Sequence, residues 1–196
     1  MIAYIKGPIV SRTPTDVWIE TVGMAYELKI SLHTYSKIAN QDQAILYTHL
    51  QVREDAHVLY GFADLEEKEL FLKLVSVSGV GASTALLMLS SMGPEELVHV
   101  ISSSDVESLK RVKGIGAKTA ERVIVDLKDK VIQALGNDGE IPIFAGSDNT
   151  KAKEALSALE VLGFNRKSAD KVVRKLLQTD GEMSVEELVK QALKKL

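Results

Sequence analysis

The sequence contains no cysteine in its 196 residues. This absence excludes disulfide bridges, thiol nucleophiles and zinc sites built on cysteine. No apolar run approaches the roughly 18 residues needed to span a bilayer, and the first residues lack the basic start and apolar core of a leader peptide. We therefore expect a soluble, cytoplasmic protein with no membrane association.

Aromatic residues are scarce and unevenly placed. The single Trp and all five Tyr lie before residue 61, whereas the rest of the chain is rich in Leu, Ala, Lys and Glu. This shift predicts a multidomain α+β protein, with a β domain followed by helical domains. Short β-favouring segments separated by turn residues indicate a small closed barrel in residues 1–62. The segments are 4–6, 17–22, 26–30 and 44–52.

Helical spacing begins after the barrel. Asp64 and Glu67 resemble a capping box, and Pro94 stands where the first turn of another helix is expected. We predict a helical domain over residues 63–135. A domain as small as the preceding barrel is only marginally stable alone, so we expect it to pack against this domain or against other subunits.

The helical pattern fails between residues 136 and 150, where Gly, Asn, Asp and Pro gather, and we predict a flexible linker there. Residues 151–196 then hold three short helical patterns, the last opened by a second capping box at Ser184 and Glu187. Such a small three-helix bundle on a tether is typical of a docking module.

An internal repeat lies in the middle of the chain. Residues 79–85 (GVGASTA) match residues 114–120 (GIGAKTA) at an offset of 35. Each copy predicts a helix, a Gly-apolar-Gly turn and a second helix. The glycines permit a tight turn and close approach of a ligand, while the apolar residue anchors the turn. The free N–H groups that begin the second helix then form an anion site suited to phosphate.

Three interpretations of this repeat compete. A plain connector between packed helices is disfavoured because the same residues recur on both sides of two turns. A nucleotide-binding loop is disfavoured because Ala117 stands before Lys118 where glycine is required, and because a helix precedes the turn. We favour paired helix-hairpin-helix elements, which hold a nucleic-acid backbone without reading its sequence.

Local charge supports this interpretation. Residues 110–130 hold seven basic and three acidic residues, although the net charge of the chain is −3. Lys118 and Arg122 are four residues apart, so they share one helix face beyond the second turn. The candidate DNA-binding residues are Gly79, Val80, Gly81, Ser83, Gly114, Ile115, Gly116, Lys118, Thr119 and Arg122.

The stretch 48–62 (THLQVREDAHVLYGF), together with both hairpins, resembles the RuvA family of Holliday-junction-binding proteins, and the resemblance runs over the whole chain. It implies an OB-fold barrel, a tandem helix-hairpin-helix domain and a three-helix motor-binding domain. It also implies a homotetramer or double tetramer that holds a four-way DNA junction open in recombination and repair. The implied protein partners are the RuvB motor ATPase and the RuvC resolvase.

The resemblance assigns further residues. Glu54 and Asp55 match an acidic pin at the centre of the tetramer, where their carboxylates would repel phosphates and help to separate strands. The first hairpin has Ala82 and Ser83 where the family commonly has Pro and Lys, which leaves mainly backbone N–H groups there. Candidate motor contacts in the C-terminal bundle are Leu159, Leu162 and Phe164.

A DNA-binding scaffold without catalytic residues or cofactors is therefore the leading prediction. One alternative is a hairpin-containing glycosylase or nuclease, for which Glu54 and Asp55 are the only acidic cluster in the barrel. Another is an RNA-binding barrel that stacks bases on aromatic side chains. The four histidines show no ligand spacing, so we predict no metal site. They are His33, His49, His57 and His99.

Overall fold

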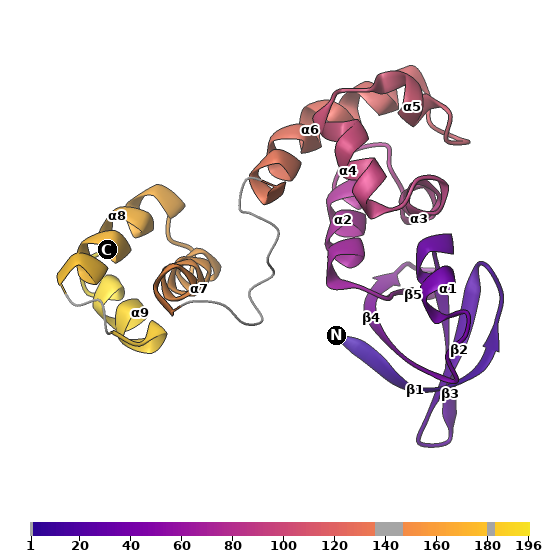
Figure 1. Cartoon of the computed structure of the whole chain (residues 1–196), viewed down its shortest axis with the longest axis horizontal. Coiled ribbons are helices and arrows are strands. Elements are labelled where there is room, and N and C mark those ends of the chain that lie inside the picture. The colour runs from indigo at the N-terminus through magenta and orange to yellow at the C-terminus, as the bar shows by residue number, and fades with distance from the viewer. Residues whose placement is uncertain (1, 136–146, 180–182) are drawn as a thin grey trace. The chain divides into compact units, whose positions relative to one another are not determined.

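A computed structural model describes residues 2–135, 147–179 and 183–196. The chain divides into two compact units, Met1–Asp138 and Gly139–Leu196, which are described separately below (Figure 1). Residues 136–146 of the predicted linker lie outside the described residues. Residues 147–150, also predicted as linker, instead form the first turn of a helix, so the helical bundle begins earlier than the sequence suggested.

The predicted barrel is present as a closed five-stranded sheet in the order β1-β2-β3-β5-β4. Its strands are β1 (Tyr4–Arg12), β2 (Asp16–Thr21), β3 (Met24–Ile30), β4 (Gln43–Val52) and β5 (His57–Phe62). All neighbouring pairs are antiparallel except β3 with β5, which closes the barrel. Alternate side chains fill the interior, including Ile5, Val17, Ile19, Leu28 and Leu46.

A short helix that the sequence analysis missed, α1 (Leu32–Ile38), connects β3 to β4. Ser31 caps it by accepting the N–H of Thr34 at 3.0 Å. Its seven residues are too few to show a helical apolar period, which explains why the sequence did not reveal it.

The turn between β2 and β3 carries backbone strain. Val22 has a φ of 48° and its side chain is 100% exposed, while Gly23 follows with a φ of 83°. A β-branched residue in the left-handed region crowds its own backbone, and here no packing compensates. We therefore expect Val22→Gly to raise the free energy of unfolding by about 1 kcal/mol.

Urea unfolding of the two proteins measures this difference. Val52→Gly is the matched control, because Val52 is 63% exposed at the end of β4 with no positive φ. Glycine should destabilise the protein there. A loss of stability in Val22→Gly as well would contradict the strain argument.

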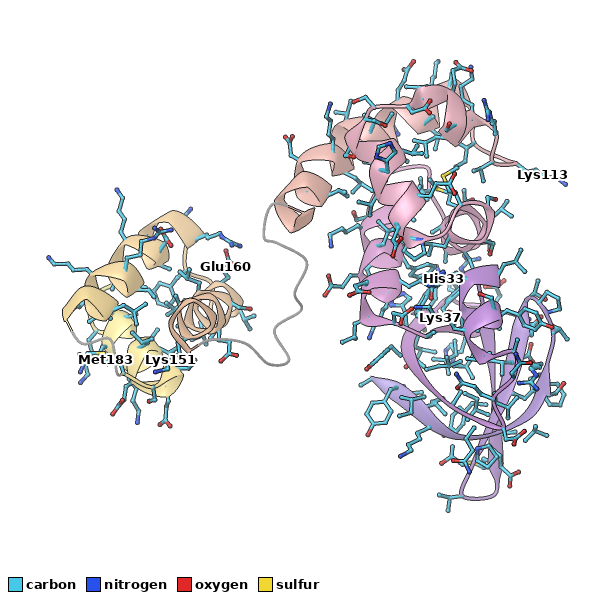
Figure 2. The ribbon with its side chains drawn as sticks, viewed as in Figure 1. His33, Lys37, Lys113, Lys151, Glu160 and Met183 are labelled. Atoms are coloured by element: carbon cyan, nitrogen blue, oxygen red, sulfur yellow. The ribbon has the colours of Figure 1, made fainter. Side chains whose placement is uncertain are left out.

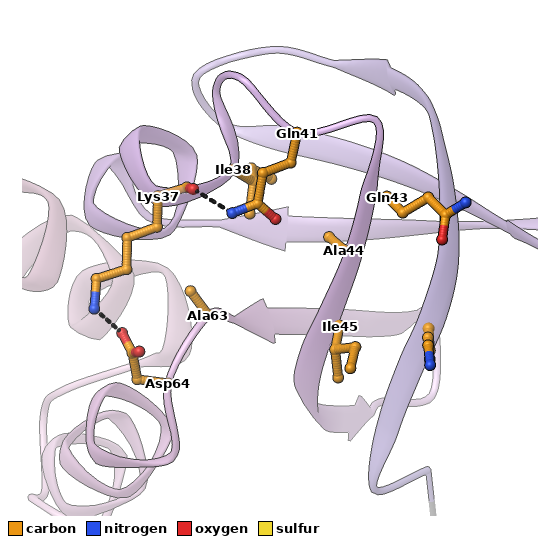
Figure 3. Close-up of a pocket in the computed structure, with 9 residues that line it drawn as sticks. Lys37, Ile38, Gln41, Gln43, Ala44, Ile45, Ala63 and Asp64 are labelled. Atoms are coloured by element: carbon orange, nitrogen blue, oxygen red, sulfur yellow. Dashed lines mark hydrogen bonds and ion pairs between the residues drawn. The ribbon is translucent and has the colours of Figure 1, made fainter.

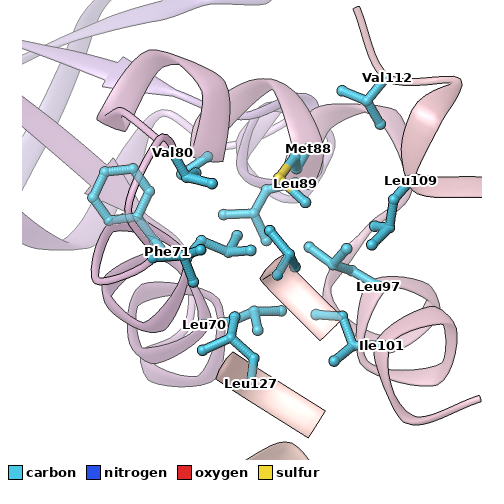
Figure 4. Close-up of a cluster of buried hydrophobic side chains, with 14 of the residues drawn as sticks. Leu70, Phe71, Val80, Met88, Leu89, Leu97, Ile101, Leu109, Val112 and Leu127 are labelled. Carbon is cyan, nitrogen blue, oxygen red and sulfur yellow. The ribbon is translucent and has the colours of Figure 1, made fainter. Parts of the chain in front are cut away.

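The helical domain predicted after the barrel is present. Its helices are α2 (Leu65–Val75), α3 (Ala82–Ser91), α4 (Pro94–Ser102), α5 (Val106–Lys110) and α6 (Ala117–Leu135). Pro94 occupies the first turn of α4, as expected. Leu70, Phe71, Met88, Leu97 and Leu127 belong to one buried cluster that joins these helices (Figure 4).

The barrel and the helical domain share that cluster. Phe71 on α2 packs against Tyr60 and Phe62 of β5, with ring centroids 5.1 and 4.9 Å apart. The ring of His49 on β4 lies against Phe71 as well, with centroids 5.7 Å apart. Burial, together with the charge of Lys68, lowers the pKa of His49. Aromatic packing therefore fixes the barrel against α2.

The predicted capping box at the start of α2 is wrong. Asp64 occupies the N-cap position, but its carboxylate binds the ammonium of Lys37 at 2.6 Å and makes no capping hydrogen bond. Glu67 is fully buried and accepts hydrogen bonds from the hydroxyls of Ser31 and Thr34, the latter at 2.5 Å. Both carboxylates therefore bind donors from α1 and its N-cap residue instead of forming a capping box at the start of α2.

The second unit is the predicted three-helix bundle, formed by α7 (Ser147–Val161), α8 (Arg166–Thr179) and α9 (Val185–Leu193). Gly163 ends the α7 segment with a φ of 92°, which allows the N–H of Phe164 to reach the carbonyl of Leu159 at 3.0 Å. The capping box of Ser184 and Glu187 is confirmed. The Ser184 N–H and hydroxyl lower the pKa of Glu187.

Candidate nucleic-acid interface

The first hairpin is a tight turn between α2 and α3. Gly79 has a φ of 93°, in the region that favours glycine. The N–H of Val80 donates to the carbonyl of Val77 at 3.0 Å, and the Val80 side chain points into the buried cluster (Figure 4). The apolar residue therefore anchors the turn, as the sequence predicts.

The second hairpin has the same geometry between α5 and α6. Gly114 has a φ of 89°, Ile115 is buried, and its N–H donates to the carbonyl of Val112 at 3.1 Å. These residues correspond to those of the first hairpin at the offset found in the sequence. The sequence repeat is thus also a repeat of structure.

Gly81 and Gly116, the last residue of each turn, play a different role from Gly79 and Gly114. A Cβ atom built on either would meet no atom within 4 Å, and Gly81 has an ordinary φ of −84°. The fold itself does not require glycine at these two positions. Their open space lies beside the first N–H groups of α3 and α6, which have no partners inside their helices. An anion can approach this backbone closely.

The predicted polar side chains divide between the hairpins. Ser83 and Lys118 are exposed at corresponding positions of α3 and α6, and Thr119 is half-buried. Lys113 is also exposed directly before the second turn and extends away from the domain (Figure 2). Lys113 was not among the residues predicted to bind DNA, although its position directly before Gly114 is a sufficient signal.

Arg122 makes a contact that the sequence did not predict. Its guanidinium Nη1 donates to the carbonyl oxygen of Ser78 at 3.1 Å, directly before the first turn. Arg122 follows Lys118 by about one turn of α6, beyond the second hairpin. The structure brings it to the first hairpin, across 44 residues of sequence.

Two other lysines of the basic segment have local partners. Lys110 pairs with Glu107 at 2.7 Å, and Lys128 donates to the hydroxyl of Ser104 at 2.7 Å. Both ammonium groups are thus engaged with neighbouring side chains of the same domain. Three further cations, Arg111, Lys113 and Lys118, are exposed close to the second turn.

The residues matched to an acidic pin lie at the tip of the β4–β5 hairpin. Glu54 and Asp55 are exposed, and the N–H of Arg53 donates to the carbonyl of Ala56 at 2.9 Å to close the turn. Within the described residues neither carboxylate has a salt bridge. The tip of this β-hairpin thus presents two solvent-exposed carboxylates.

The three candidate motor contacts differ in exposure. Leu159 is fully buried in the core of the bundle, Phe164 is half-buried against that core, and Leu162 is 56% exposed. Leu159 cannot reach a partner from inside the core. Of the three candidates, only Leu162 and Phe164 are exposed enough to contact a partner protein.

His33, Asp64 and Glu67 bring possible metal-ligand atoms within 4.8 Å of one another, a grouping that spacing in the sequence did not reveal. Both carboxylates already hold donors, from Lys37 and from the hydroxyls of Ser31 and Thr34. The arrangement serves as a polar tie between α1 and α2.

Beside this tie lies an open groove of about 450 Å³, in which Lys37 contacts Asp64 (Figure 3). Residues of β1, α1, β4 and the start of α2 line it, and neither hairpin contributes. Among the described residues, no helix combines the length and the apolar character of a membrane-spanning segment.

Comparison with known proteins covers nearly the whole chain. Residues 1–61 match the model of the RuvA N terminal domain, residues 71–129 the SAM-like helix-hairpin-helix tandem, and residues 150–196 the RuvA C-terminal domain.

Full-length relatives agree with these matches. The chain is 54% identical to a protein of Christiangramia forsetii and 50% identical to one of Flavobacterium psychrophilum, each over 100% of both chains. A protein of Cytophaga hutchinsonii is 45% identical over 99% of both chains. All three are named Holliday junction branch migration complex subunit RuvA. With the barrel, the paired hairpins and the C-terminal bundle in the same order, the chain belongs to the RuvA family.

Proposed function

We propose that the protein binds four-way DNA junctions by their shape, as a subunit of a branch-migration complex. The duplicated hairpin carries this proposal, because two turns of the same geometry each expose helix N-terminal amides beside an unobstructed glycine. The names of the relatives supply the junction as the DNA structure in question.

The two hairpins suit a duplex backbone. Each offers N–H groups and the positive end of a helix dipole to a phosphate, and these groups carry no base-specific information. Lys113 and Lys118 add charge at the second turn. Discrimination between DNA structures would then depend on how several copies of the pair are arranged in space.

A tetramer would provide that arrangement, with one subunit for each arm of the junction. Large apolar side chains exposed on the barrel support association, since burying them against another copy is favourable. They include Tyr4, Trp18, Met24 and Ile45. In a four-fold assembly the exposed pins would repel phosphates at the crossover and hold strands apart, and two such tetramers would enclose the junction.

The chemistry of branch migration would belong to a partner. We propose that this subunit is not an enzyme and uses no cofactor, that its C-terminal bundle recruits the RuvB ATPase through Leu162 and Phe164, and that RuvC acts on the same junction. Because its proposed ligand is DNA, we propose that the protein acts in the cytoplasm. The alternative of a DNA repair enzyme predicts that the pin carboxylates cut or modify DNA.

The direct test is a gel-shift comparison of a four-way junction, a linear duplex and a single strand. We expect tightest binding to the junction whatever its sequence, with log K falling by about 0.9 per phosphate for each unit of log salt. Mass photometry of the same samples should show a tetramer. Equal affinity for matched linear duplex would refute the proposal, and strand cleavage in magnesium would favour the repair enzyme.

A chain truncated after Gly136 tests the division of labour. We expect it to bind the junction as the full chain does, because the first unit contains both hairpins and its own buried cores. It should fail to stimulate ATP-driven branch migration by RuvB. Full stimulation by the truncated chain, or loss of junction binding while folded, would contradict this assignment.

A further inference from the structure

The two hairpins share one geometry but not one charge. Lys118 and Arg122 of the second copy correspond to Ser83 and Leu87 of the first at the offset of 35. The first copy therefore has no cation at either position. The sequence holds no lysine or arginine between Lys73 and Lys110, while it holds four carboxylates there, Glu95, Glu96, Asp105 and Glu107.

The contact of Arg122 with Ser78 compensates for this deficit. Its Nη1 lies 3.1 Å from the carbonyl oxygen directly before Gly79, so a guanidinium from the second copy sits at the turn of the first. Only one of its five N–H donors is needed for that bond, and the side chain is exposed. The remaining donors are free to reach a phosphate that the α3 amides hold, and a planar guanidinium suits phosphate geometry.

The internal symmetry shows that the contact is not a by-product of the repeat. The equivalent contact in the opposite direction would run from Leu87 to the carbonyl of Lys113, and Leu87 has no donor. The link is therefore made in one direction only. Lys118 therefore lies at the second turn, whereas the guanidinium of Arg122 lies at the first.

We propose that Arg122 is a phosphate-binding residue of the first hairpin, although it belongs by sequence to the second. This inference rests on the proposed DNA-binding function of the hairpins. Arg122 also positions the two turns relative to each other, since its other contact is the backbone of the first turn.

Moving a charge into the first hairpin tests the inference. Ser83→Lys places a lysine on α3 where Lys118 stands on α6. We expect Arg122→Gln to weaken DNA binding about 10-fold and to reduce the salt slope by about 0.9. Adding Ser83→Lys should restore most of the affinity and the slope to Arg122→Gln.

Lys118→Gln is the matched control, because it removes one exposed charge from the same helix face. Ser83→Lys should improve that variant only by the factor that it gives to the unmodified chain. An equal effect of Ser83→Lys in both backgrounds would overturn the proposal. So would an Arg122→Gln variant that loses affinity with an unchanged salt slope, since Arg122 would then act only on the backbone of Ser78.

The outcome is separable from that of the proposed function. The affinities of all six proteins, which are the unmodified chain, Arg122→Gln and Lys118→Gln, each with and without Ser83→Lys, are also measured on linear duplex. There the hairpin contacts operate without any choice of DNA structure. If the protein did not prefer junctions but the rescue occurred, the proposed function would fail and the role of Arg122 would stand. Circular dichroism spectra that match the unmodified chain ensure that each variant is folded.

Discussion

Replacing Gly81 and Gly116 together by alanine is expected to lower affinity for a four-way junction by roughly 100-fold or more. Each new methyl group would occupy the open space beside the first amides of α3 or α6 and push a phosphate away from them. Hydrogen bonds to a charged group contribute about 1.5 to 3 kcal/mol each, and the double variant loses them at both turns.

The same variant should keep its stability, because neither methyl group meets an atom within 4 Å. Thermal unfolding and gel shifts on one preparation separate the two effects. Gly79→Ala with Gly114→Ala is the contrasting pair: those residues have φ values of 93° and 89°, so alanine should lower both stability and binding. Normal junction binding by the Gly81 and Gly116 variant would move the DNA surface away from the hairpins.

Glu67→Ala should lower the free energy of unfolding by about 2 to 6 kcal/mol. The buried hydroxyls of Ser31 and Thr34 both donate to this carboxylate. Each hydroxyl oxygen also accepts a backbone N–H: that of Ser31 from Thr34, and that of Thr34 from Ala63. Without Glu67, two buried donors are left without an acceptor, at about 1 to 3 kcal/mol each.

Chemical denaturation of the full chain, followed by the fluorescence of Trp18, measures this loss. Glu66→Ala is the control, since Glu66 is the exposed neighbour of Glu67 in the first turn of α2. It should change stability by only a few tenths of a kcal/mol. Similar effects of the two substitutions would show that the buried hydrogen bonds contribute little.

Local patterns made the hairpins predictable from the sequence. The glycines at 79 and 114, the buried Val80 and Ile115, and the start of each following helix depend on residues close in the chain, and duplication made the pattern distinctive. The barrel was predictable for a similar reason, because its strands alternate and end at turn residues.

Contacts between distant residues were not predictable. Arg122 was assigned to the second hairpin because helical spacing places it beside Lys118, yet its carbonyl partner belongs to a turn 44 residues earlier. Asp64 and Glu67 fitted a capping box, but donors on a helix too short to recognise engaged them instead. Leu159 and Leu162 share an apolar pattern, and only packing shows which one is buried.

The path from the pin to the hairpins has a mechanical consequence under the proposed function. The strand β5 runs from the pin turn to Phe62, and α2 begins at Leu65 after only two residues. Phe71 on α2 packs against the aromatic rings of β5, and Glu67 on α2 accepts a hydrogen bond from Thr34 of α1. These contacts stiffen the connection between β5 and α2. A force applied to the pin by moving DNA would therefore be transmitted through β5 to α2 and the first hairpin. The contacts between that hairpin and the DNA arm bound by the same subunit would then resist movement of the pin.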